Sequence, residues 1–359
     1  MVTHTTANLH LCDKIIFMGP GGRLCFCGNV EEAKRFYQTD DLVNIYNMIA
    51  ADPEGCERNY LNYRGRSRVH QHPASGQERL SIARERVGFR QFGVLLQRYT
   101  ELMFNDRQRL FVLLLQPCLI AILLYIVADE NIFKIYESTK SMLFALSCSG
   151  IWIGLFNSIQ EICKERTIVK REYMANLRLS GYVLSKFVFQ MVLGGVQAVL
   201  LTMIFLKLVG NEKEGIFFDH FSPEMLLSVW LTVLAAIGLG FVISAVVKTG
   251  DKAMAIAPFV LIIQLLFSGI LFTLEGAGKV ISYVTVSRWS VEALGSIAKL
   301  NRLSLKLQAD YPMLEHEAES FFKATGGHVG QCWGILTFMT VLFLLVSMVA
   351  LRRIAKDTR

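Results

Sequence analysis

The most evident chemistry in this sequence lies in a short charged segment, residues 160–179. Acids and bases alternate there: Glu161, Glu165 and Glu172 stand among Lys164, Arg166, Lys170 and Arg171. On a helix such charges pair at spacings of three and four residues, but each pair contributes only about 0.2–0.5 kcal/mol. Helix stability does not explain so many charges, so we expect some of them to dock onto a partner domain. The alternative is a solvated basic segment that only orients the chain in a membrane.

A second set of polar side chains lies within or near long apolar segments: Asn157, Gln190, Gln197, Gln264 and Ser268. Neutral polar groups in such segments usually hydrogen-bond between helices. The alternative is that they line a translocation path. Glycines in the same segments are expected to permit close helix contact: Gly194, Gly195, Gly238 and Gly240. The centres of the apolar segments lack ionisable groups, which argues against a proton-driven carrier.

Other catalytic chemistry finds little support. The sequence has no G-x-x-x-x-G-K-[ST] phosphate loop, and a strand follows the glycine turn at residues 19–22, where a phosphate loop requires a helix. No apolar strand ends in an Asp-Glu pair. Cys25 and Cys27 lack metal-type spacing, and His70 and His72 are expected to be solvated. We predict no metal site, and no His/Asp/Glu cluster at the end of an apolar segment.

The elements that must position these residues are membrane-spanning helices. The 359 residues are 53% hydrophobic and 19% charged, with a mean hydropathy of +0.40, whereas soluble domains have about 45–50% apolar and about 25% charged residues. Six segments are long enough to cross a hydrocarbon core of about 30 Å: 110–127, 141–159, 188–209, 225–247, 253–274 and 333–351. Lys186 flanks the third, where it is expected to extend to the interface.

Basic residues orient these segments. They gather at residues 84–109, 160–179 and 352–359, which share one side of the membrane if the number of spans is even. By the positive-inside rule that side is cytoplasmic. The net charge of +7 is therefore attributed to cytoplasmic loops, not to nucleic-acid binding. We expect a multi-pass cell-membrane protein with both termini in the cytoplasm. Its external segment, 275–331, is expected to contain short interfacial helices over 280–286 and 289–298.

The N-terminal residues 1–52 predict a small α/β region. Strands are expected at 14–17 and 24–27 around the glycine turn. Asn29 is expected to cap a helix over 30–37, and Asp41 to open another over 42–50. The polar residues 53–88 are expected to form a linker, and residues 89–106 an amphipathic helix along the inner interface. The membrane domain is expected to occupy residues 107–355.

The N-terminal region resembles the C-terminal part of an ABC-transporter ATPase domain. The resemblance rests on His4, the strand at Asp13 and Lys14, the glycine turn, and the strand that ends at Gly28. His4 matches the switch histidine, which contacts the γ-phosphate in that family, and an imidazole can donate a hydrogen bond to a phosphate oxygen. The segment 160–182 resembles the family's coupling loop, and 288–294 its Glu-Ala-Leu stretch.

The order of these parts resembles G-type exporters and their bacterial relatives. The resemblance implies a mainly α type-2 exporter permease fold that works as a homodimer or with a second half-transporter, in lipid, and is driven by an ATPase domain that uses ATP and Mg²⁺. It assigns coupling to Glu161, Glu165, Arg166, Arg171 and Glu172. Because the ATP site is incomplete, we expect an N-terminally truncated chain that hydrolyses no ATP alone. The alternatives are a permease subunit with a separate ATPase, a membrane-embedded enzyme and, less favoured, a channel.

Overall fold

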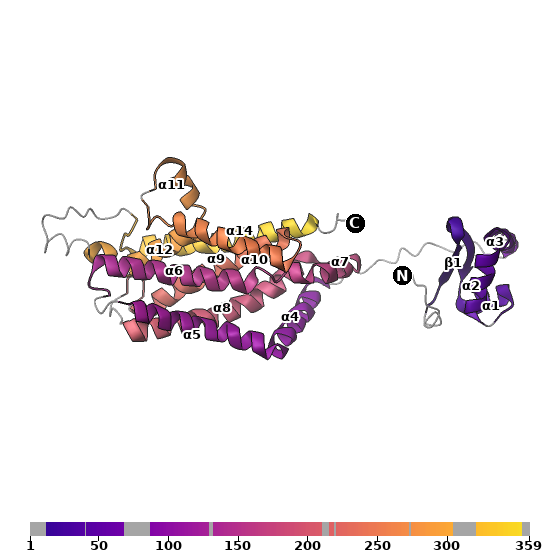
Figure 1. The fold of residues 1–359 in the computed structure, drawn as a ribbon, viewed down its shortest axis with the longest axis horizontal. Coiled ribbons are helices and arrows are strands. Elements are labelled where there is room, and N and C mark those ends of the chain that lie inside the picture. The colour runs from indigo at the N-terminus through magenta and orange to yellow at the C-terminus, as the bar shows by residue number, and fades with distance from the viewer. Residues whose placement is uncertain are drawn as a thin grey trace. The chain divides into compact units, whose positions relative to one another are not determined.

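The computed structural model contains two compact units, Met1–Arg84 and Glu85–Arg359 (Figure 1). It describes residues 12–39, 41–67, 87–128, 132–209, 215–218, 220–272, 274–303 and 321–353. His4 lies outside the described residues. The architecture is mainly α-helical, with a small two-stranded sheet in the first unit.

The sheet of the first unit is an antiparallel hairpin. Strand β1 (Ile15–Gly19) pairs with β2 (Arg23–Gly28), so that Ile15 faces Gly28. The short helix η2 (Pro20–Gly22) joins them. Gly21 and Gly22 have φ angles of 78° and 75°, which a residue without a Cβ adopts at no steric cost. The predicted strands and glycine turn are confirmed.

Two predicted helices follow the hairpin. Helix α1 (Val30–Tyr37) begins with a capping box in which the Asn29 side chain accepts from the Glu32 N–H at 2.7 Å. Helix α2 (Leu42–Ala51) begins with Asp41, whose carboxylate accepts from the Val43 N–H at 2.9 Å. Each cap satisfies a backbone donor that the first helical turn leaves free.

The predicted linker over 53–88 is wrong in its first part, because Pro53–Ser67 forms helix α3. The Tyr60 hydroxyl donates to the Cys27 carbonyl oxygen at 3.1 Å, and Arg23 pairs with Glu54 and Glu57 at 2.7 and 2.9 Å. Tyr60 also joins the core of the unit, which comprises Ile15, Cys25, Phe26, Val30, Ala33, Tyr37, Ile45 and Ile49. The segment was predicted to be a linker because its composition is polar, but it forms a helix that packs against β2.

The second unit is a bundle of membrane-length helices. Among the described residues, five helical stretches are long and apolar enough to cross a membrane. They comprise α5 (Arg107–Val127), α6 (Tyr136–Ser158) continued through η4 (Cys163–Glu165) and α7 (Arg166–Met174), α8 (Leu179–Val209), α9 (Phe221–Val246) and α14 (Gly326–Leu351). Helix α4 (Val87–Asn105) precedes them, where the amphipathic helix was expected.

The predicted fifth span, 253–274, has different bounds. Helix α10 (Gly250–Leu266) has 17 residues, which at about 1.5 Å per residue gives about 26 Å, short of a core about 30 Å thick. Beyond it lie α11 (Gly276–Ser282) and α12 (Val286–Ile297). Helix α12, where an interfacial helix was expected, is buried against other helices along most of its length. The six-span count therefore stays a prediction.

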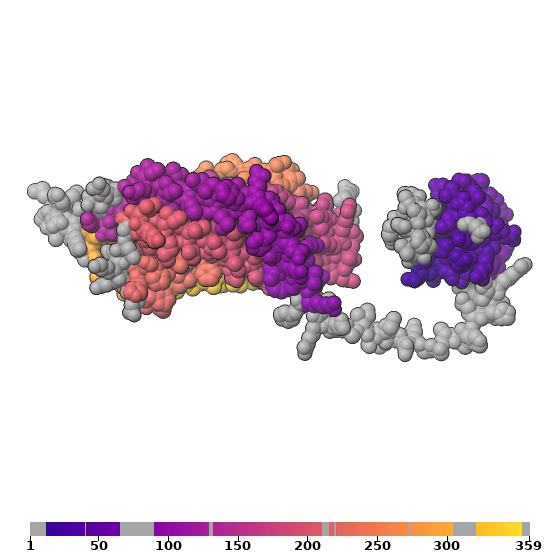
Figure 2. All heavy atoms as spheres, turned by 90° about the horizontal axis from the view of Figure 1, so that it is seen from below, coloured from indigo at the N-terminus to yellow at the C-terminus, as the bar shows by residue number. Residues whose placement is uncertain are grey.

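The core of the bundle centres on α9, which packs against α6, α8, α12 and α14. A Cβ at Gly240 would collide with the Ser158 side chain, and one at Gly194 would lie 2.9 Å from a Val233 methyl group. These glycines therefore permit the close helix contact expected of them. Helix α5 lies at the surface, where Figure 2 shows it beside α4, and exposes apolar side chains such as Phe111 and Ile126.

Candidate functional site

The charged segment between α6 and α8 is fastened to the end of α9. The backbone N–H groups of Ile162 and Cys163 both donate to the Ser244 hydroxyl oxygen, at 2.9 and 3.1 Å. The Arg166 guanidinium donates to the Val247 carbonyl oxygen at 3.1 Å. These bonds tie the segment to the membrane helices, so that the two cannot move independently without breaking them.

Glu161 lies at the centre of a buried ionic cluster, and its side chain is 4% exposed. It accepts hydrogen bonds from the Tyr99 hydroxyl at 2.6 Å and from Lys186 Nζ at 3.4 Å, and it forms an ion pair with Arg109. Burial, together with the charge of Glu161, raises the pKa of Tyr99 well above its usual value, so the phenol stays protonated and donates. A buried carboxylate requires such partners, because desolvation destabilises its charge.

Lys186 joins Glu161 to a second acid of the segment. Its Nζ lies 3.0 Å from a Glu165 oxygen and 4.3 Å from the centroid of the Tyr99 ring. The Tyr182 hydroxyl donates to the other Glu165 oxygen at 2.8 Å. Lys186, which the sequence predicts to extend to the interface, lies about two turns after the start of α8 at Leu179. It is 2% exposed, because its ammonium is enclosed by these partners. We call Tyr99, Arg109, Glu161, Glu165 and Lys186 the α7-end cluster.

Three of the predicted neutral polar residues extend this cluster into the bundle. Gln190 donates to the Tyr99 hydroxyl oxygen at 3.1 Å and to the Asn157 carbonyl oxygen at 3.2 Å. The Asn157 amide donates to the Gln197 side chain at 2.5 Å, and Gln197 donates to the Leu113 carbonyl oxygen at 2.8 Å. The result is a continuous chain of hydrogen bonds through α4, α8, α6 and α5, made from the helix contacts that such residues favour.

The other two predicted polar residues lie apart from this chain. Gln264, near the end of α10, accepts from the Ser287 N–H at 3.1 Å and so joins α10 to α12. The Ser268 hydroxyl donates to the Leu265 carbonyl oxygen at 2.8 Å, and its oxygen accepts from the Ile270 N–H at 3.3 Å. Ser268 therefore stabilises the turn that ends α10.

The remaining residues that the sequence assigns to coupling lie nearer the surface. Glu172 pairs with Arg98 of α4 at 2.5 Å, with side chains 29% and 42% exposed. Arg171 is exposed, as are its neighbours Ile168 and Met174. The five predicted residues thus do not form one docking surface: Glu161 is enclosed by the bundle, Glu165, Arg166 and Glu172 are half-buried, and Arg171 faces outward.

Sequence reasoning missed Tyr99, Arg109 and Lys186 as partners of the segment. Tyr99 lies 62 residues before Glu161, and no local pattern relates two residues so far apart. The one available signal was Lys186 itself, two residues before the apolar segment 188–209, since a charge that enters a membrane requires a partner.

Membrane-length apolar helices packed around α9 define a multi-pass membrane protein. The sequence model of the family described as ABC-2 type transporter matches residues 90–298, which run from α4 to just beyond α12, and the chain belongs to this family. It is therefore a component of a transmembrane transporter, and the resemblance to ABC transporters noted in the sequence is confirmed.

One similar protein is the ABC transporter ATP-binding/permease protein Rv1747 of Mycobacterium tuberculosis (strain ATCC 25618 / H37Rv). The two are 26% identical over 313 residues, which cover 84% of this chain. The matched part spans 36% of that relative. The name of the relative describes it as both an ATP-binding protein and a permease.

Proposed function

We propose that this chain is the membrane-spanning part of an ATP-driven exporter, and that the segment 160–179 passes the movement of an ATPase domain to the helices. The observation that supports this most is Lys186, a buried lysine of α8 that pairs with two acids of the segment, Glu161 and Glu165. A shift of the segment must either move α8 with it or separate buried charges. Separation is unfavourable in a low-dielectric environment, so the helix moves.

The segment has an exposed part, which would dock the ATPase domain, and a buried part, which would transmit its movement. Ile168 and Met174 are 48% and 73% exposed, and Arg171 lies between them on α7. This mixed apolar and basic face is suited to docking an ATPase domain. Glu161 and Glu165 face inward and transmit the movement to α8, while Glu172 carries it to α4 through Arg98.

The complete transporter would use ATP with Mg²⁺ and would work as a dimer, of two copies or with a second half-transporter. The printed name of the relative supports ATP as the energy source. The ATPase domain would be on the same polypeptide or on a separate subunit. His4 would contact the γ-phosphate there. The exposed apolar side chains of α5 would face lipid or the second half.

An uncoupling experiment tests this proposal. A transporter that carries its ATPase domain is placed in lipid vesicles, and two quantities are measured: ATP hydrolysis, and the ATP-dependent change in accessibility of a cysteine introduced at the exposed Leu271. Glu165→Gln should leave hydrolysis intact but suppress the accessibility change. Arg171→Ala should lower both. Glu275→Gln, at an exposed acid far from the segment in sequence, is the matched control and should change neither. Wild-type behaviour of Glu165→Gln and Arg171→Ala would show that the segment is only an orientation signal.

The proposed orientation places the segment and both termini in the cytoplasm of a cell-membrane protein, because basic residues gather on that side. The test is labelling of an Arg171→Cys variant in intact cells after the 8 native cysteines are replaced. A membrane-impermeant thiol reagent should label it only after the cells are opened. Labelling in intact cells would reverse the orientation.

A further inference from the structure

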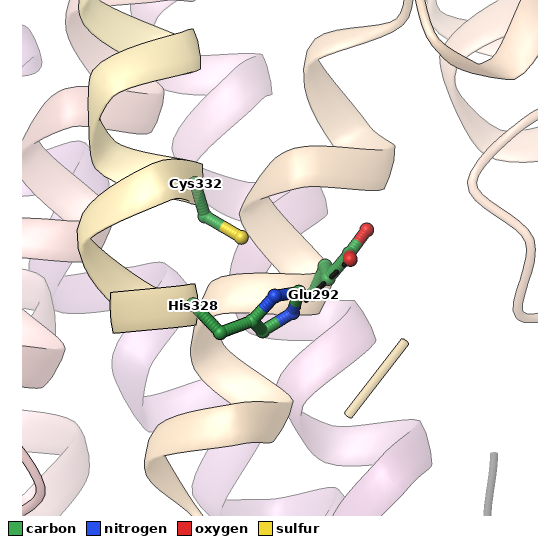
Figure 3. A group of neighbouring side chains, drawn as sticks. All are labelled: Glu292, His328 and Cys332. Carbon is green, nitrogen blue, oxygen red and sulfur yellow. Dashed lines mark ion pairs between the residues drawn. The ribbon is translucent and has the colours of Figure 1, made fainter. Parts of the chain in front are cut away.

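The other end of the bundle contains three side chains with metal-binding chemistry. Glu292 lies on α12, and His328 and Cys332 lie on the first turns of α14, on one face because they are four residues apart. One ligand atom from each lies within 4.8 Å of the other two, and Figure 3 shows the three side chains gathered between the two helices. We call these residues the α12-end cluster. The sequence predicted no His/Asp/Glu cluster at the end of an apolar segment, whereas here a carboxylate and an imidazole meet beside a thiol.

Two members of this cluster are buried, His328 is partly buried, and one oxygen of the carboxylate lacks a hydrogen bond. Glu292 is 5% exposed and Cys332 0% exposed. One Glu292 oxygen lies 3.2 Å from His328 Nε2, while the other has an ion pair with Arg288 at 3.5 Å and no hydrogen bond. Buried carboxylate oxygens normally have hydrogen-bond partners. The unmet oxygen faces the Arg288 guanidinium, which leaves the other Glu292 oxygen beside the imidazole and the thiol. His328 Nε2 also lies 2.9 Å from the Phe321 carbonyl oxygen. The site therefore rests on a carboxylate, an imidazole and a thiol gathered within 4.8 Å.

We propose that Glu292, His328 and Cys332 bind a divalent transition-metal ion of the zinc class. The donor set is one nitrogen, one sulfur and one oxygen. Zn²⁺ accepts all three, whereas Mg²⁺ and Ca²⁺ prefer oxygen alone. Three protein ligands leave a fourth tetrahedral position for water.

Arg288 completes the site from outside the coordination sphere. Its guanidinium is held independently of Glu292, by a hydrogen bond to the Ser282 hydroxyl at 3.1 Å and by the Tyr283 ring at 4.8 Å. It can therefore keep one carboxylate oxygen oriented while the other binds the ion, as outer partners of metal ligands do. The thiol loses its proton on binding, and the thiolate and carboxylate together balance the charge of the ion.

A bound ion would join two helices that the rest of the bundle already positions. The Ser290 hydroxyl of α12 lies 2.7 Å from the hydroxyls of Ser147 on α6 and Thr232 on α9. With α12 fixed on that side, a metal bridge to α14 would hold this end of the bundle closed. The site is independent of the proposed ATP coupling and needs no nucleotide for its test.

The experiment uses the purified full chain in lipid nanodiscs, cleared of metal with a chelator. Co²⁺ serves as the probe, because its bond to a thiolate absorbs in the near ultraviolet, and Zn²⁺ is then used to displace it. Wild-type protein should show this absorption at one ion per chain. The outer partner variant Arg288→Gln should weaken Zn²⁺ binding by about 10–100-fold. Cys332→Ala, which removes a ligand, should abolish the absorption and weaken Zn²⁺ binding more than Arg288→Gln does.

Cys163→Ala is the matched control, since Cys163 is a buried cysteine near the α7-end cluster, and it should retain the absorption. His328→Gln gives a second test that changes no thiol, and it should also weaken Zn²⁺ binding more than Arg288→Gln does. Absence of the absorption in the wild type, or its persistence in Cys332→Ala, would overturn the proposal.

Discussion

The two ends of the membrane bundle, marked by α7 and α12 in Figure 1, hold buried charge in different ways. In the α7-end cluster, both oxygens of Glu161 accept hydrogen bonds, from Arg109, Tyr99 and Lys186. In the α12-end cluster, one Glu292 oxygen has no hydrogen bond and its neighbours include a thiol. A satisfied ionic cluster acts as a rigid link between elements, whereas an unsatisfied one with mixed donors is suited to a ligand. Similar burial therefore supports two different proposals, mechanical transmission at one end and ion binding at the other.

The largest effect is expected from breaking the α7-end cluster. Lys186→Met removes the cation shared by Glu161 and Glu165 and leaves buried acids with fewer partners, which should destabilise the protein by about 3–5 kcal/mol. Thermal unfolding of the purified protein should show a clear decrease in Tm. Lys279→Met, at an exposed lysine, is the control. An unchanged Tm in Lys186→Met would mean that the cluster does not stabilise the fold.

The second prediction concerns the α12-end cluster alone: adding and removing metal should change the thermal stability of the protein. Zn²⁺ at about 100 times its Kd should stabilise the wild-type chain by about 2.7 kcal/mol, and a chelator should reverse the increase in Tm. Cys332→Ala should show neither shift. A similar metal-dependent shift in that variant would place the ion elsewhere.

The third prediction concerns the close contact between α6 and α9 near the α7-end cluster. Gly240→Ala introduces a methyl group against Ser158, which should push α9 away from α6 and destabilise the protein by about 1–3 kcal/mol. Gly334→Ala in α14 meets no atom within 4 Å and should have no such effect. Equal Tm values for the two variants would show that α6 and α9 are not tightly packed there.

The smallest effect is expected from the exposed part of the charged segment. Arg98 and Glu172 are partly exposed, and pairs of this kind contribute about 0–1 kcal/mol. Arg98→Gln should therefore lower Tm only slightly, and less at high salt because the pair is screened. A loss as large as that in Lys186→Met would mean that the pair is shielded from water by a partner or by lipid.

Local features of the fold were predictable, and so was the family. The hairpin, the Asn29 cap and the Asp41 cap follow from short-range patterns, and the apolar segments follow from composition. Helix α3 was missed because its polar residues gave no amphipathic pattern. The end of α10 was missed because hydropathy continues beyond Leu266 while the backbone turns, with Gly269 at a φ of 80°.

For the candidate sites too, some of the residues were predictable from the sequence, and only the structure gave their partners. The sequence identified Glu161 and Glu165 as members of a charged segment that resembles a coupling loop, and Gln190 as a neutral polar group in an apolar segment. It did not give those partners: Gln190 and Tyr99 are 91 residues apart. Nor did it bring Glu292 to His328 and Cys332, which α12 and α14 supply from separate parts of the chain.

By itself, the sequence determined that the chain enters a membrane and where its charges lie along the chain, because both depend on the local composition of each segment. The tertiary structure alone decided that Lys186 is buried between two acids and that a thiol, an imidazole and a carboxylate meet at the other end. Those choices depend on how α8, α12 and α14 pack against α9 and its neighbours. Helix packing brings together side chains distant in sequence, and no periodicity within one segment records which ones will meet.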